Sequence, residues 1–200
     1  MRLLSICTLA LLGVVAAAAA PLNDLYVGLD SMRGYAPVYW WFLSDGRFLN
    51  ALPANGVSAA DFNAGCSTHP GFCGAYTLSG NRLSMRYNDG HTQEWTYKPL
   101  NGGFMMNYLI LAPVQQFPSG TKLNGTWDKP GVGATFYSFH PDGTYSYKFV
   151  SAYGTTDQSG TYSISGYSLT LTGQNGGRHM VFPVSGGNLA IDGVVYTKEK

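Results

Sequence analysis

The sequence predicts an all-β protein made of two copies of one antiparallel β-meander unit. The heptapeptide at residues 74–80 (GAYTLSG) recurs at residues 160–166 (GTYSISG), with Leu83 and Leu169 in matching places after it. Short segments such as residues 144–149 (TYSYKF) alternate polar and apolar side chains, which is the pattern of strands with one face in the core. Glycine supplies 26 of the 200 residues and interrupts these segments too often to leave room for long helices.

Each copy is expected to form about six short strands joined by tight turns. The strongest turn signals are the dipeptides Asp45-Gly46 and Asp142-Gly143, which occupy matching places in the two copies. A hairpin is predicted over residues 75–87 and a matching one over residues 161–171, each with a glycine at its turn.

The first repeat is assigned to residues 21–112 and the second to residues 121–200, with a connection at residues 113–120. This connection is short for a free linker, and a copy of ~80 to 90 residues is near the lower size limit for an independent core. We therefore expect either one continuous barrel or two closely packed small barrels or half-barrels. Closure of the sheet would also remove exposed strand edges.

The first copy carries an insertion at about residues 53–73. Gly46 and Gly74 are 28 residues apart, whereas their counterparts Gly143 and Gly160 are 17 apart. Within the insertion, only residues 57–62 are expected to form a helical turn. A loop added to a repeat can hold a function or act as a lid over a barrel mouth, and both interpretations stay open.

Residues 1–20 have the layout of a secretory signal peptide: a basic start, an apolar run and an alanine-rich end, with cleavage expected near residues 18–20. We therefore expect a secreted or periplasmic protein. No further apolar stretch is long enough to predict a membrane span. In an oxidising compartment Cys66 and Cys73 are expected to form a disulfide, which closes a small loop and contributes about 2 to 3 kcal/mol.

Charge argues against polyanionic partners. The chain has 12 basic and 11 acidic residues, and removal of Arg2 with the signal peptide leaves no net charge. A neutral chain lacks the basic surface that binding to nucleic acid or to an anionic membrane requires.

Motifs for catalysis or metal binding are not recognised in the sequence. The histidines outside the signal peptide, His69, His91, His140 and His179, do not stand at the spacing of a local metal site. A nucleophile elbow and a phosphate-binding glycine loop are also missing. Glu94 is the one acid in mid-strand and is expected to face solvent. We therefore assign no catalytic residue, metal or cofactor.

Aromatic side chains are the compositional excess that points toward binding. Residues 39–42 (YWWF) place large rings on both faces of one strand, and Tyr145, Tyr147 and Phe149 form a stripe on the matching strand of the second copy. Such rings can pack the core, stack on sugars or enclose an apolar ligand.

The second copy resembles small lipocalin-like β-barrel domains of secreted bacterial proteins. The similarity rests on Leu123-x-Gly125-x-Trp127, on the Phe139 to Tyr145 turn motif and on residues 160–171, and the first copy follows it more loosely, with Gly28 but without the tryptophan. The resemblance implies an antiparallel barrel with an interior cavity. It implies no activity and no catalytic residue.

Three functional hypotheses follow. The leading one is a non-enzymatic barrel that holds a small apolar or aromatic molecule, with Trp41, Trp95 and Tyr147 as candidate lining residues. The second is a module that binds glycans or protein surfaces through outward rings and the insertion. The third is a hydrolase or isomerase at the barrel mouth around His69, His91 or His179, which would require a histidine beside an acid in a concave pocket.

Overall fold

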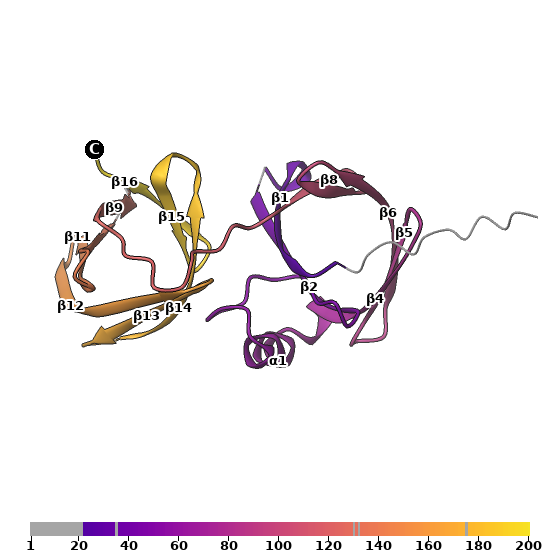
Figure 1. Ribbon diagram of the computed structural model, residues 1–200, viewed down its shortest axis with the longest axis horizontal. Coiled ribbons are helices and arrows are strands. Elements are labelled where there is room, and N and C mark those ends of the chain that lie inside the picture. Colours follow the sequence, from indigo (N-terminus) through magenta and orange to yellow (C-terminus); the bar gives the residue numbers. More distant parts are fainter. Residues whose placement is uncertain (1–21, 35, 130, 132, 175) are drawn as a thin grey trace, which may run out of the picture.

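The computed structural model describes residues 22–34, 36–129, 131, 133–174 and 176–200. The predicted signal peptide lies outside these residues. The described chain forms two closed antiparallel barrels of eight strands each, which lie side by side (Figure 1). This architecture confirms the all-β fold of duplicated meanders, and it takes the form of two packed barrels rather than one continuous barrel.

Barrel 1 closes because its first strand pairs with its last. Its strands in order are β1 (Asp24–Asp30), β2 (Ala36–Phe42), β3 (Arg47–Leu49), β4 (Cys73–Ser79), β5 (Arg82–Tyr87), β6 (Thr92–Leu100), β7 (Gly103–Met106) and β8 (Leu109–Pro113). A short 3-10 helix, η1 (Ser31–Arg33), joins β1 to β2, and the insertion between β3 and β4 contains α1 (Ala59–Thr68) and η2 (Pro70–Phe72).

Barrel 2 repeats this order and closes by pairing β16 with β9. Its strands are β9 (Gly125–Lys129), β10 (Ala134–Phe139), β11 (Thr144–Ser151), β12 (Gly154–Ser165), β13 (Ser168–Gly173), β14 (Gly177–Val184), β15 (Asn188–Ile191) and β16 (Val194–Lys198), with η3 (Ser185–Gly187) before β15.

Each barrel therefore has eight strands where the sequence predicted about six. One missed strand, β3, has only three residues, which is too short to show alternation. The last hairpin of barrel 1 was also hard to recognise, because it turns through Asn107 without a glycine. That of barrel 2 turns through Asp192-Gly193, which is an Asp-Gly pair of the kind named above. The φ angles of Asn107 and Asp192 are 52° and 50°. Asn and Asp tolerate this left-handed conformation better than most residues, so no glycine is needed at these two positions.

The two barrels share the contacts that tie the turn between the second and third strands to the fourth strand. The backbone N–H groups of Tyr76 and Tyr162 donate to the carbonyls of Gly46 and Gly143, both at 2.7 Å. The Tyr76 hydroxyl lies 2.8 Å from the carbonyl oxygen of Leu22, and the Tyr162 hydroxyl accepts the Leu123 N–H at 2.7 Å. These bonds show that the sequence repeat is a structural repeat.

Large side chains fill much of each barrel, as expected for eight strands, whose interior is just wide enough for side chains. In barrel 1 the fully buried members of this core include Phe42, Phe48, Leu83, Phe104, Met106 and Leu111. In barrel 2 the buried core includes Trp127, Tyr137, Phe139, Tyr145, Tyr162 and Leu169.

A third apolar cluster lies between the barrels, where outward-facing residues of β1, β2 and β3 meet those of β14 and β15. Trp41 belongs to this cluster, is 4% exposed, and packs edge-on against Phe62 of α1 with ring centroids 5.4 Å apart. Tyr39 meets Phe182 of barrel 2 at 6.1 Å. The neighbouring barrel and the insertion therefore bury Trp41 fully and Tyr39 in part.

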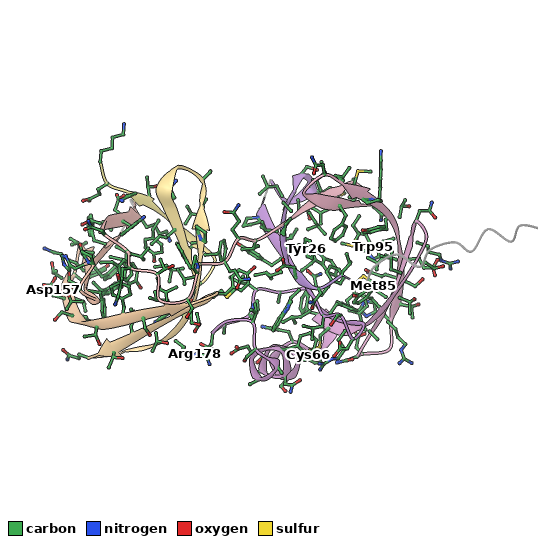
Figure 2. The ribbon with its side chains drawn as sticks, in the orientation of Figure 1. Tyr26, Cys66, Met85, Trp95, Asp157 and Arg178 are labelled. Atoms are coloured by element: carbon green, nitrogen blue, oxygen red, sulfur yellow. A yellow bond between two sulfur atoms is a disulfide. The ribbon has the colours of Figure 1, made fainter. Side chains whose placement is uncertain are left out.

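The insertion is locked to both barrels. Its helix begins at a capping box in which Ser58 and Asp61 exchange hydrogen bonds, and it extends beyond the helical turn predicted at residues 57–62. Arg178 of barrel 2 donates to the carbonyl of Asn55 at 3.0 Å and lies 3.5 Å from the Asp61 carboxylate. Figure 2 shows Arg178 at the boundary between the barrels, on the side of α1.

A disulfide joins Cys66 of α1 to Cys73 at the start of β4, as the sequence predicted. It closes the segment that contains η2, and Asn88 donates to the Cys73 sulfur at 3.2 Å. The disulfide thus holds the end of the insertion against the wall of barrel 1.

Candidate functional site

A cup of about 470 Å³ opens at one mouth of barrel 1. It lies where β1, β3, β5 and β7 end and where β2, β4, β6 and β8 begin, so its lining comes from all around the barrel. We call it the barrel 1 cup. Its aromatic lining includes Trp40, Phe72, Tyr87, His91, Trp95 and Tyr108.

Trp40 and Trp95 form the inner wall of the cup. Trp40 is 3% exposed and Trp95 is half-buried, and their rings meet edge-on with centroids 6.1 Å apart. Trp40 also packs against Phe42 and Phe48, which are fully buried in the barrel core. The filled core therefore gives the cup an apolar floor. Figure 2 shows Trp95 within the outline of barrel 1.

Gln93 supplies a fixed polar group beside these rings. Its side-chain oxygen accepts the Trp95 indole N–H at 3.1 Å and lies 3.0 Å from the Tyr87 hydroxyl. Burial, with a smaller contribution from the Asp89 carboxylate, raises the pKa of Tyr87 to about 12, so the hydroxyl is protonated at neutral pH and can donate.

His91 stands on the rim of the cup next to an acid. Its ring stacks on Tyr87 with centroids 3.8 Å apart, and its Nδ1 lies 2.5 Å from Asp89 Oδ1. Hydrogen bonds from His91 lower the pKa of Asp89, which holds the carboxylate ionised. Serine, threonine and cysteine are missing from the described lining of the cup, so a hydrolase of the serine or cysteine type would have no nucleophile there.

Two exposed aromatic side chains also stand on the rim, and the insertion supplies one of them. Phe72 and Tyr108 are 50% and 56% exposed, and both line the cup. Phe72 lies in the segment that the Cys66–Cys73 disulfide closes, so the insertion forms one wall of this mouth.

The three residues predicted to bind ligand lie in three different places. Trp95 lines the barrel 1 cup. Trp41 is buried between the barrels, as described above. Tyr147 is half-buried in barrel 2, 4.9 Å from Tyr137 between ring centroids, and borders a groove of about 510 Å³ on that barrel.

The histidines named in the third hypothesis also lie apart. His91 pairs with Asp89, and His179 pairs with Asp192 in barrel 2 at 2.8 Å. His69 ends α1 and meets Phe72 edge-on at 5.8 Å. Of the three, His91 meets the requirement of an acid partner in a concave pocket.

Several lining residues were not singled out from the sequence. Trp40 alternates with Trp41, so one of the two had to face the barrel interior, and Gln93 lies two residues before Trp95 on the same strand face. Phe72 could not be found in this way, because it belongs to the insertion, whose path no alternation describes.

The corresponding positions of barrel 2 are more polar. The ring of Tyr137 packs near those of Tyr147 and Tyr196, and His179 takes the position that Trp95 has in barrel 1. Tyr145, which is 2% exposed, has a buried hydroxyl without a hydrogen-bond partner among the described residues.

Within the described ranges, three or more His, Cys, Asp or Glu side chains do not gather in a group that could hold a metal ion. Among the same residues, no helix combines the length and the apolar character needed to cross a membrane.

Comparison with known proteins gives no match: neither a protein-family model, nor a curated protein, nor a solved structure is similar to the chain.

Proposed function

We propose that the chain is an exported, lipocalin-like binding protein that holds a small apolar or aromatic molecule in the barrel 1 cup. The observation that supports this function best is the aromatic lining of the cup, in which Trp40 and Trp95 meet above a filled apolar core. Export is supported by the leader-like residues 1–20 and by the Cys66–Cys73 disulfide, which persists in oxidising compartments.

The size of the cup suits a ligand with about one to three rings. Its volume of about 470 Å³ is within the ~300 to 1,000 Å³ of small-molecule sites. A ligand that buries roughly 200 Å² of apolar surface there would gain about 5 kcal/mol from desolvation, before the cost of association is subtracted.

Native mass spectrometry of the mature protein from its own source tests the proposal. A reproducible added mass that is released by denaturation and organic extraction would support it and would identify the ligand. Trp95→Ala should abolish the added mass, because it removes an inner wall of the cup. Tyr147→Ala is the matched control in barrel 2. Loss of the added mass from Tyr147→Ala instead would contradict the placement of the ligand.

Glycan binding is the second candidate, and a specific surface supports it. The groove of about 510 Å³ on barrel 2 is lined by hydroxyl groups from neighbouring strands, together with Phe136 and Asp157 (Figure 2 labels Asp157). Hydroxyl donors beside the rings of Phe136 and Tyr147 match the polar edges and apolar faces of sugars. Glycan binding that Ser146→Leu removes and Trp95→Ala leaves intact would favour this second function.

A further inference from the structure

The hydrogen bonds of Gln93 determine which end of its side-chain amide can reach a ligand. An indole N–H can only donate, so the atom of Gln93 that lies 3.1 Å from Trp95 Nε1 must be the amide oxygen. The protonated Tyr87 hydroxyl, 3.0 Å from the same atom, is the second donor. Both acceptor positions of the Gln93 oxygen are therefore occupied by protein donors.

The amide NH₂ of Gln93 is left to interact with the contents of the cup. Gln93 is exposed, lines the cup, and lies on the same face of β6 as Trp95, two residues away. Among the described residues, no side chain or carbonyl accepts a hydrogen bond from its NH₂. Residues two apart on one strand face are ~7 Å from each other, so a ring that packs against Trp95 brings its edge to this donor.

We propose that Gln93 determines the specificity of the barrel 1 cup and selects planar aromatic ligands that have a hydrogen-bond acceptor, a carbonyl oxygen or a ring nitrogen, at one edge. This inference rests on the proposed function, since it assigns the ligand class of the same cup. Other lining groups supply the apolar contact area, and Gln93 supplies the orientation.

Matched ligand pairs test this selection. Naphthalene and quinoline have the same shape and differ by one ring nitrogen, and indane and 1-indanone differ by one carbonyl. Burial alone favours the less polar member of each pair, because desolvating an acceptor costs free energy. The wild-type mature protein should instead bind quinoline about tenfold more tightly than naphthalene, and 1-indanone about tenfold more tightly than indane. This is the effect of one well-formed neutral hydrogen bond.

Two variants distinguish a Gln93 that donates a hydrogen bond to the ligand from one that only holds Trp95 and Tyr87 in place. Gln93→Glu keeps an oxygen for the Trp95 and Tyr87 donors but replaces the NH₂ group with a second acceptor, so the preference should reverse in favour of naphthalene and indane. Gln93→Met keeps the side-chain length without either polar group and should also lose the preference. Gln158→Met in barrel 2 is the matched control and should bind as the wild type does.

Dissociation constants from ligand-detected NMR titration provide the readout, with near-UV circular dichroism as the check that each variant is folded. Equal affinity of the wild type for both members of each pair would overturn the inference and leave the proposed function intact. So would an unchanged preference in Gln93→Glu. Failure of all four compounds to bind the wild type would overturn the proposed function and the inference with it.

Discussion

Barrel 1 and barrel 2 are most alike where the fourth strand of each barrel approaches the fifth, and least alike at the mouth. A Cβ atom at Gly74 would lie 2.0 Å from the carbonyl oxygen of Arg86, and one at Gly160 would lie 1.9 Å from that of Thr172. The same close approach of two strands therefore occurs in both barrels. Positions of this kind tolerate a single residue type, because backbone atoms cannot move aside.

Mouth positions have no such constraint, and there the two barrels have diverged. Trp40 and Tyr137 are equivalent by strand register, as are Trp95 and His179. In each case an apolar ring in barrel 1 corresponds to a side chain with a polar end in barrel 2. Closure of the sheet is therefore set by sterics, while the character of the mouth can be changed one side chain at a time.

The largest loss of stability is expected at a glycine position that the two barrels share. Gly74→Ala and Gly160→Ala should each lower the free energy of unfolding by about 3 kcal/mol or more, because the added methyl group overlaps a carbonyl oxygen and the strands must separate. Denaturant unfolding measures this loss. In contrast, a Cβ at Gly80 meets no atom within 4 Å, so Gly80→Ala should cost only about 1 kcal/mol for its φ of 59°. Equal losses at Gly74 and Gly80 would contradict the steric explanation.

A second effect should be confined to barrel 1, because only barrel 1 carries the insertion. Reduction of Cys66–Cys73 should lower the free energy of unfolding by roughly 2 kcal/mol, since the closed loop is short. The same treatment should weaken ligand binding in the cup, whose wall includes Phe72. Guanidinium unfolding with and without dithiothreitol measures the change. A Cys66→Ala/Cys73→Ala double variant, which should not respond to dithiothreitol, is the control.

Much of this fold could be predicted from sequence, because the repeat and the turn glycines indicate where the strands end and reverse direction. The hairpin β4–β5 pairs Ser79 with Arg82, and β12–β13 pairs Ser165 with Ser168, as the recurring heptapeptide indicated. The number of barrels could not be predicted, because alternation tells which side chains share a face but not how many strands close a ring.

The candidate site was harder to predict because burial alone does not mark the inside of a barrel. Trp40 and Trp41 lie on opposite faces of β2, and both are buried, one by the lumen and the other by barrel 2 and α1. A single sequence cannot show that the outer face is covered by a second barrel. The role of Gln93 depends on two hydrogen bonds that only the folded arrangement brings together.

A smaller effect should distinguish the two cores at one equivalent position. Register places Phe48 of barrel 1 where barrel 2 has Tyr145, whose buried hydroxyl has no partner among the described residues. Tyr145→Phe should therefore raise the free energy of unfolding by about 1 kcal/mol, because it removes a buried polar group without leaving a cavity. Thermal unfolding of the variant provides the measurement. A loss of stability would instead mean that the hydroxyl makes a favourable contact.

The smallest effect concerns pH and again separates the two mouths. The hydrogen bond with Asp192 raises the pKa of His179 above its ordinary value, while burial partly opposes this shift. A histidine whose pKa is raised by folding stabilises the protein fully below its unfolded pKa of ~6.5, and this contribution is lost as the pH rises through the folded value. Trp95, its counterpart in barrel 1, does not titrate.

The free energy of unfolding should therefore fall between about pH 6 and pH 8 by less than about 1 kcal/mol, since His179 is partly exposed and solvent screens its charge. The decrease should be absent from His179→Gln and retained in His140→Gln, so the difference between these two curves isolates the pair. An NMR titration that gave the His179 ring a pKa below 6.5 would contradict this prediction, because the free energy of unfolding would then rise with pH. Barrel 2 would then have no charged pair at its mouth, and its difference from the barrel 1 cup would rest on the tyrosine hydroxyls alone.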